Sequence, residues 1–281
     1  MKKGLSMLLA LMLLVMATPV MAMAAEETAR PILIQGAMDL ETSTMMAALE
    51  GAQDVMVSGY HYVTGTIDGY PVVVSKTQVG MVNAATTTTI ALIKWNPCVV
   101  INQGTAGGHD VALHKGDIVL GTTTVNVNSF KSEWADAGAG IDPTKWENRA
   151  TEVLQNGEVV EVMELKSDAK LVEFAKNLSA EYEKGQVVEG VIGSGDVWNK
   201  ELDRINLIHS QFGTSCEEME TFSVAQVCAY FDVPFLGMRI LSNNELHKED
   251  FDPQTGEDCQ LFTLEVVRAL IADQQALDQA A

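Results

Sequence analysis

The chain has 281 residues, of which 47% are hydrophobic, and it carries a formal net charge of −20. This length fits one large α/β domain or two small ones, and the apolar content can supply a sizeable core. The strong negative charge argues against a protein that binds nucleic acid or anionic membranes, because like charges repel.

The first residues have the pattern of a secretory signal peptide. Two lysines precede an apolar run, and the small residues Ala22 and Ala24 follow it. The run is short for a membrane-spanning helix, so we expect cleavage after Ala24, or after Ala22, rather than a retained anchor. The predicted organisation is a signal peptide over 1–24 and one domain over 25–281. The mature protein is expected to be exported, periplasmic or secreted, with no membrane association.

Apolar runs suited to buried strands recur along the chain and end in glycine or asparagine. They cover 31–38, 70–80, 97–108, 116–128, 186–196 and 233–243. Helical patterns lie between several of them, at 40–49, 167–182, 221–230 and 261–271. Ser167 is the expected cap of the second helix. The alternation predicts an α/β fold with a mostly parallel or mixed sheet, whose ligands bind beyond the carboxyl ends of the strands.

The cysteines and histidines do not suggest a metal site. There are four cysteines and five histidines, without a C-x-x-C pair. An oxidising compartment permits disulfides, but the spacing indicates no particular pairing. We therefore expect neither a metal nor another cofactor.

Two polar clusters follow predicted strands in the first half of the chain. Glu41, in GAMDLE, comes after a strand and a glycine turn; it could act chemically or simply face the positive end of a helix. Thr105, in NQGTAGG, lies in a glycine-rich turn that could offer backbone N–H groups to an anion or could be only a tight turn.

Three further clusters lie in the second half. Trp198, in SGDVWN, could stack on a flat base or pack into the core. The stretch EEMET holds Glu217, Glu218 and Glu220 where a helix begins, so the carboxylates could bind sugar hydroxyls or interact with the helix dipole. Arg239, within an apolar strand, must be buried and paired.

Together, GAMDLE, QVGMVNAA, INQGTAGG with KGDIV, and EEMET resemble the motifs of the purine nucleoside phosphorylase/hydrolase superfamily. The resemblance covers about Pro31 to Leu270 and is strongest to the bacterial 5′-methylthioadenosine/S-adenosylhomocysteine nucleosidases. It implies a three-layer α/β/α sandwich around a mixed, curved sheet, and a homodimer.

The resemblance also implies roles for individual residues. Glu41 would be the general base that activates the attacking water, and Thr105, Glu220 and Arg239 would surround that water. Thr105 stands where most relatives carry serine. The substrate-binding residues implied in this way are Met38, Val79, Trp198, Asn199, Glu218, Met219, Glu220, Ser242 and Phe251. Met219 and Glu220 would hold the ribose, Trp198 would face the base, and Met38, Val79 and Phe251 would line the pocket for the 5′ group. Asn199 departs from the apolar residue expected there.

Asn243 is the main departure from the family pattern, because the adenine-specific nucleosidases have an aspartate there that can protonate N7. An amide cannot act as this acid, although it can donate to N7 or to the O6 of a 6-oxopurine.

The sequence predicts an exported purine nucleosidase that hydrolyses methylthioadenosine or adenosylhomocysteine and releases adenine. A nucleosidase for 6-oxopurine compounds of the inosine or futalosine type, or a nucleoside-binding protein without catalysis, are the alternatives. Water is favoured over phosphate as the nucleophile because the predicted site is rich in carboxylates. A metal- or cysteine-dependent hydrolase is disfavoured for lack of clustered ligands.

Overall fold

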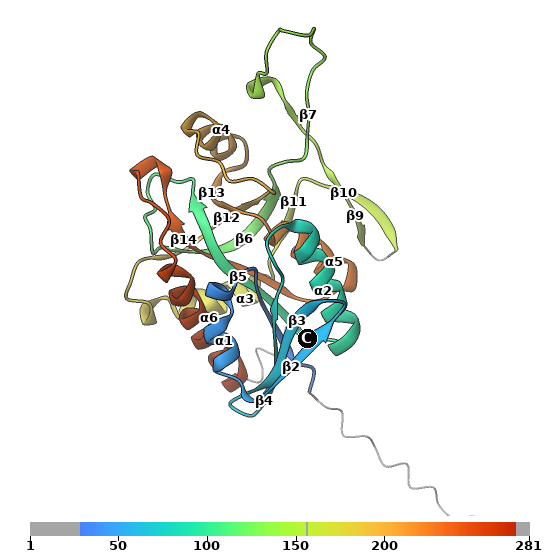
Figure 1. The fold of residues 1–281 in the computed structure, drawn as a ribbon, viewed down its shortest axis with the longest axis vertical. Coiled ribbons are helices and arrows are strands. Elements are labelled where there is room, and N and C mark those ends of the chain that lie inside the picture. The colour runs from blue at the N-terminus through green and yellow to red at the C-terminus, as the bar shows by residue number, and fades with distance from the viewer. Residues whose placement is uncertain (1–28, 156, 274–281) are drawn as a thin grey trace, which may run out of the picture.

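The computed structural model describes residues 29–155 and 157–273; the expected signal peptide lies outside the described residues. Its strands are β1 (Ile32–Gly36), β2 (Glu50–Val57), β3 (Tyr60–Ile67), β4 (Tyr70–Lys76), β5 (Val99–Gly108), β6 (Ile118–Asn126), β7 (Phe130–Lys131), β8 (Glu147–Asn148), β9 (Thr151–Gln155), β10 (Glu158–Val162), β11 (Glu164–Lys166), β12 (Val187–Ser194), β13 (Thr214–Glu218) and β14 (Phe235–Asn243). Its α-helices are α1 (Ser43–Ala47), α2 (Met81–Trp95), α3 (Ala169–Asn177), α4 (Leu202–Phe212), α5 (Thr221–Phe231) and α6 (Gln254–Ala272) (Figure 1). The six predicted strands are all confirmed, as β1, β4, β5, β6, β12 and β14.

Ten of the strands form one mixed sheet in the order β11-β6-β12-β13-β5-β1-β4-β3-β2, and β14 pairs with both β5 and β6. Because of this double pairing, β6, β12, β13, β5 and β14 form a closed ring. The predicted α/β class with a mixed, curved sheet is confirmed. The prediction of a three-layer sandwich needs correction, since strong curvature closes half of the sheet into a barrel-like core instead of leaving it as an open middle layer.

Three glycines lie side by side on neighbouring strands of the ring. Gly121 on β6 lies opposite Gly190 on β12 and opposite Gly237 on β14. A Cβ atom at position 190 would lie 2.9 Å from the Ser215 Cβ, and one at position 121 would lie 2.5 Å from the Ile192 Cδ1. Residues without a side chain let neighbouring strands approach this closely.

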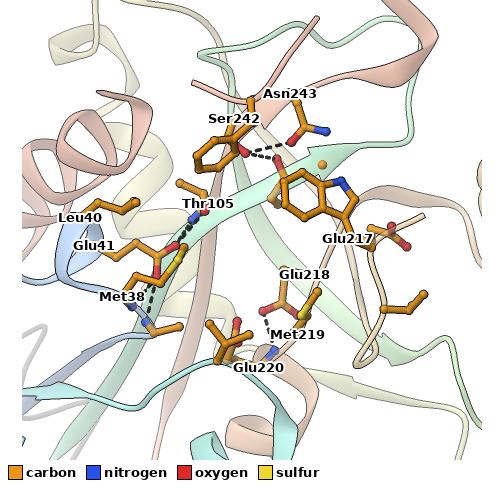
Figure 2. Close-up of a pocket in the computed structure, with 17 residues that line it drawn as sticks. Met38, Leu40, Glu41, Thr105, Glu217, Glu218, Met219, Glu220, Ser242 and Asn243 are labelled. Carbon is orange, nitrogen blue, oxygen red and sulfur yellow. Dashed lines mark hydrogen bonds between the residues drawn. The ribbon is translucent and has the colours of Figure 1, made fainter. Parts of the chain in front are cut away.

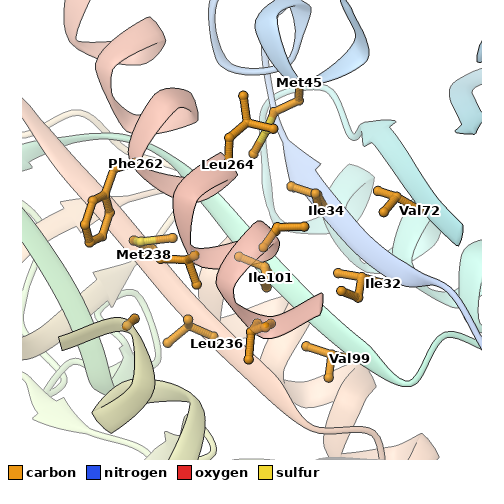
Figure 3. Close-up of a cluster of buried hydrophobic side chains, with 14 of the residues drawn as sticks. Ile32, Ile34, Met45, Val72, Val99, Ile101, Leu236, Met238, Phe262 and Leu264 are labelled. Atoms are coloured by element: carbon orange, nitrogen blue, oxygen red, sulfur yellow. The ribbon is translucent and has the colours of Figure 1, made fainter. Parts of the chain in front are cut away.

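Helices cover both faces of the sheet around β1 and β5. Alternate residues of a strand point to opposite faces. Ile32 and Ile34 accordingly join the core beneath α6, which Figure 3 shows, whereas Leu33 packs in the cluster formed with α2 and α5. Figure 1 shows α1 and α6 on one side of β5, and α2 and α5 on the other. The apolar clusters on the two faces hold the central strands in place, and the polar clusters gather at the carboxyl ends of these strands.

Two local expectations were wrong. The helix predicted at 40–49 is broken into a 3-10 turn (Asp39–Glu41) and the short α1. The cap of α3 is Asp168, whose carboxylate accepts from the Lys170 and Leu171 N–H groups, and not Ser167. The hydroxyl of Ser167 instead accepts from the Gly237 N–H at 3.2 Å.

No helix in the described ranges has both the length and the apolar character needed to cross a bilayer.

Candidate active site

A cavity of about 330 Å³ lies at the carboxyl ends of the central strands (Figure 2). All the predicted site residues except Arg239 and Asn199 line it. They are Met38, Glu41, Val79, Thr105, Trp198, Glu218, Met219, Glu220, Ser242, Asn243 and Phe251. Glu41 and Glu220, far apart in the sequence, therefore face the same space, as the predicted site requires.

Glu41 is the most firmly held of these residues. Its Oε2 accepts from the N–H groups of Ala37 (2.8 Å) and Met38 (3.1 Å), and its Oε1 accepts from the Thr105 N–H and hydroxyl, both at 2.8 Å. Three of these four donors are backbone groups that cannot turn away, whereas the Thr105 hydroxyl can rotate. A water molecule could therefore reach Oε1 by replacing the hydroxyl as donor.

The glycine-rich stretch predicted as a turn is the last part of strand β5, and it gives Glu41 room. A Cβ atom at position 104 would lie 2.8 Å from the Glu41 Oε1. Gly104 therefore serves the close approach of this carboxylate to the Thr105 N–H.

Two buried glutamines hold the segment that carries Glu41. The Gln103 side-chain amide donates to the Glu41 carbonyl at 2.5 Å. Gln260, on α6, donates to the Leu40 carbonyl at 2.7 Å and accepts from the Thr44 N–H at 2.8 Å. Side chains from β5 and α6 thus fix the backbone on both sides of the proposed base.

Arg239 is buried and paired, as predicted, and it is not among the residues that line the cavity. The guanidinium donates to the Glu218 Oε2 (2.5 and 3.1 Å), to the Asn102 carbonyl and side chain (3.1 and 2.7 Å) and to the Met238 carbonyl (2.9 Å). These five bonds use all five N–H groups of an arginine. Arg239 therefore acts on the site through Glu218, and its donors are not available to substrate or water.

Glu218 borders the cavity, but its contacts favour a structural role over the predicted substrate contact. Its carboxylate accepts from the Glu220 and Thr221 N–H groups, both at 2.9 Å, and from the Ser194 hydroxyl as well as from Arg239. These bonds hold the start of α5 against β12 and leave little acceptor capacity for a ligand.

Glu220 is the acid with acceptor capacity to spare. Its Oε1 accepts from the Gly80 N–H at 2.9 Å, and its Oε2 lies 3.8 Å from the Arg239 Nη2. Burial, reinforced by the Glu218 and Glu41 charges, raises the pKa of Glu220 to about 8. Arg239 and the Gly80 N–H act in the opposite direction, but the arginine charge is already engaged by Glu218. Burial itself would lower the pKa of Arg239, yet the glutamates around it raise that pKa further, so it stays charged.

Ser242 and Asn243 lie at the end of β14. The Ser242 hydroxyl is 3.0 Å from the Asn243 Oδ1 and 3.1 Å from the Ala106 carbonyl. With its oxygen facing Ser242, the Asn243 amide presents its N–H₂ end near Gly107 and the cavity (Figure 2). Asn243 therefore offers hydrogen-bond donors to a ligand.

An aromatic pair closes another side of the cavity. The rings of Trp198 and Phe251 meet edge to face at 5.8 Å between centroids. With Met38, Val79 and Met219 they supply the apolar surface predicted for the base and the 5′ group.

Asn199 does not line the cavity, contrary to prediction. Its backbone and side-chain N–H groups donate to Glu217 at 2.8 and 2.7 Å. Glu217, one of the EEMET carboxylates to which the family resemblance gave no individual role, does line the cavity. Its place beside Glu218 was the available signal. The other lining residues that were not predicted are Ala37, Leu40, Ala106, Gly107 and Val197.

Within the described part of the chain, no group of three or more His, Cys, Asp or Glu side chains is arranged to hold a metal ion. The four cysteines are buried free thiols.

The chain is similar to known proteins of one family. A model of the phosphorylase superfamily matches residues 31–272. The chain belongs to the phosphorylase superfamily. Within this superfamily, the chain is 34% identical over 217 residues to the 5′-methylthioadenosine/S-adenosylhomocysteine nucleosidase of Bacillus cytotoxicus, covering 75% of this chain and 85% of the relative.

The fold also matches solved structures of nucleosidases. The fold matches the Neisseria meningitidis methylthioadenosine/adenosylhomocysteine nucleosidase in complex with methylthio-immucillin-A, with a TM-score of 0.71, 26% identity and coverage of 86% of this chain and 100% of that chain. The Streptococcus pyogenes S-adenosylhomocysteine nucleosidase in complex with 5-methylthiotubericidin matches with a TM-score of 0.69 and 25% identity, over 86% and 98% of the two chains. The resemblance expected from the motifs is confirmed.

Proposed function

We propose that the protein is an N-glycosidase that hydrolyses 5′-methylthioadenosine or S-adenosylhomocysteine and releases adenine. Its curated and solved relatives carry this nucleosidase name. The observation that carries the proposal is the Glu41 carboxylate, held by four hydrogen bonds and facing the same cavity as Glu220.

The chemistry follows from these positions. The C1′–N9 bond breaks with its electron pair on the base, which takes a proton from solvent, since Asn243 cannot supply one, and leaves as adenine. The oxocarbenium-like sugar that remains is stabilised by nearby carboxylates. A water molecule that takes the place of the Thr105 hydroxyl donates to Glu41, and Glu41 removes its proton as the oxygen attacks C1′. Glu220 accepts from the ribose hydroxyls, and Met219 packs on the sugar.

The charge of the cavity favours water over phosphate as the nucleophile. Four acidic side chains border the cavity, those of Glu41, Glu217, Glu218 and Glu220, and Glu220, with its pKa of about 8, carries the least negative charge near neutral pH. Arg239, the cation beside them, has every N–H group engaged. A phosphate would meet buried negative charge without a free partner, which costs several kcal/mol.

The decisive experiment is a base-release assay with methylthioadenosine, adenosylhomocysteine and inosine. Glu41→Gln should lower the rate by about 10²-fold or more, as expected on losing a general base. Asp39→Asn is the matched control, since Asp39 is an exposed acid of the same turn that pairs with Lys76. Tight binding without turnover in the unmodified protein would instead identify a nucleoside-binding protein.

One observation favours the second candidate, a nucleosidase for 6-oxopurine compounds. Asn243 presents N–H donors, which suit the O6 and N7 acceptors of a 6-oxopurine, and it cannot protonate N7 as an acid. Asn243→Asp should raise the rate of adenine release, because the new carboxyl group can supply that proton. Unchanged or slower release would contradict this account of position 243.

We further propose that the protein is exported and forms a homodimer. Export is supported by the signal-peptide pattern of 1–24. The mass of the protein recovered from the periplasm or medium tests cleavage after Ala24. Dimer formation is supported by the exposed apolar residues Val82 and Ile93 on α2.

A further inference from the structure

The loop between β12 and α4 carries Trp198 and is tied to the protein on both sides of that residue. Before it, the Gly195 N–H donates to the Glu218 carbonyl at 2.9 Å, and the Asp196 carboxylate accepts from the Met81 N–H at 2.9 Å. After it, Asn199 donates twice to Glu217. Trp198 itself is 52% exposed, so packing around the indole does little to fix it, and the loop backbone sets its position.

Glu217 is a buried carboxylate that the proposed reaction does not use. Only 6% of the residue is exposed, and its two oxygens each accept one bond from Asn199. A buried charge is costly unless it is well paired, so its presence at the cavity wall calls for a role.

His109 supports this carboxylate from the other side. Its Nδ1 is 2.9 Å from the Thr214 hydroxyl, and its Nε2 is 3.3 Å from the Glu217 Oε2. The Nε2 atom is buried and has no hydrogen-bond partner among the described residues, but it lies within ion-pair distance of this carboxylate. Glu217 is thus confined between Asn199 and His109.

We infer that Glu217 is a positioning residue for the purine base: by holding Asn199 through two hydrogen bonds, it sets the adjacent Trp198 against the cavity and Phe251. This inference rests on the proposed function for its substrate class. Asn199 then acts on the substrate indirectly, through Trp198, and not by the predicted direct contact. Loss of Glu217 should therefore weaken the binding of the base and leave the chemical step unchanged.

A charge-exchange pair of variants tests it. Glu217→Gln sets an amide N–H₂ against the N–H groups of Asn199, and Asn199→Asp sets two carboxylates against each other. The double variant restores complementarity, because the new amide donates to the new carboxylate while its oxygen accepts from the backbone N–H of residue 199. Each single variant should raise KM about ten-fold, the effect of a lost buried hydrogen bond to a charged group, with little change in kcat. The double variant should recover most of the loss in KM.

The same variants should be titrated with adenine and with hypoxanthine by calorimetry, which reports affinity without turnover, and their melting temperatures compared. Unchanged KM and base affinity in Glu217→Gln would overturn the inference. So would equal losses of kcat and melting temperature that the double variant does not restore, since these indicate a purely structural role. If the unmodified protein binds a base but releases none, the proposed hydrolysis fails, while the calorimetric arm still decides the role of Glu217. If it binds neither base, both proposals fall.

Discussion

At the scale of single residues, the two acids that face the cavity differ in how their charge is supported. Glu41 accepts four hydrogen bonds, three of them from backbone N–H groups. Glu220 accepts one close bond, and burial, reinforced by the charges of two nearby carboxylates, raises its pKa to about 8 from the ordinary 4.5. In the proposed reaction the first carboxylate takes a proton from water and the second accepts from the sugar hydroxyls, and the burial of the second has a cost in stability.

That cost predicts a pH dependence of folding. Between the two pKa values, the folded protein binds a proton on Glu220 that the unfolded chain does not bind. The contribution of Glu220 is therefore fully favourable below the unfolded pKa and is lost as pH rises through the folded pKa. The free energy of unfolding should fall between about pH 4.5 and 8, and Glu220→Gln should flatten this fall. Urea unfolding across that range measures it; an equally steep fall in the variant would contradict the assignment.

The sequence identified eleven of the seventeen cavity-lining residues, some from their place at strand ends and others through the family resemblance. It did not reveal which of them touch a ligand. Arg239 donates to Asn102, a residue of the neighbouring strand. Asn199 donates to Glu217, because β12 pairs with β13. Such pairings depend on strand register between distant segments, which local patterns do not encode.

At the scale of elements, the predicted strands were the buried ones, whose continuous apolar runs are distinctive. The hairpin of β2 and β3 was missed because β2 is largely exposed and polar. The ring closure was also missed, since it requires β14 to pair with β5 and β6 at once. The glycines at positions 121, 190 and 237 make this closure possible and are visible in the sequence only as isolated small residues.

Because the strands of the ring lie so close together at these glycines, we expect one added methyl group at position 190 to lower stability. Gly190→Ala should lower the free energy of unfolding by about 1–3 kcal/mol, because the new Cβ would overlap Ser215. The cost should shrink in a Ser215→Gly background, where the overlapping atoms are gone. Urea unfolding of the four proteins gives the coupling energy, and a cost independent of residue 215 would show that the strands can separate freely here.

At the scale of the whole molecule, the outer face of α2 stands out. Val82 is 75% exposed and Ile93 is 70% exposed, although most apolar side chains of this chain lie in the two cores. Val79, just before α2, borders the cavity, so a second copy seated on this face would lie close to the substrate. This is the surface we propose for the homodimer.

Ile93→Glu should convert the dimer to monomer, because a buried unpaired carboxylate would oppose association. Light scattering coupled to gel filtration measures the mass directly. Val111→Glu, which changes a similarly exposed valine on the loop between β5 and β6, is the control and should leave the mass unchanged. A monomeric unmodified protein would refute the proposed dimer.

The hydrogen bond from Gln260 to the Leu40 carbonyl links the activity of the protein to the folding of its last helix. The backbone beside the proposed base is secured by a glutamine 220 residues further along the chain. A nascent or C-terminally shortened polypeptide that lacks α6 cannot set this acid in place, even with every cavity-lining side chain already synthesised. The proposed hydrolytic activity should therefore begin only after the last helix has docked.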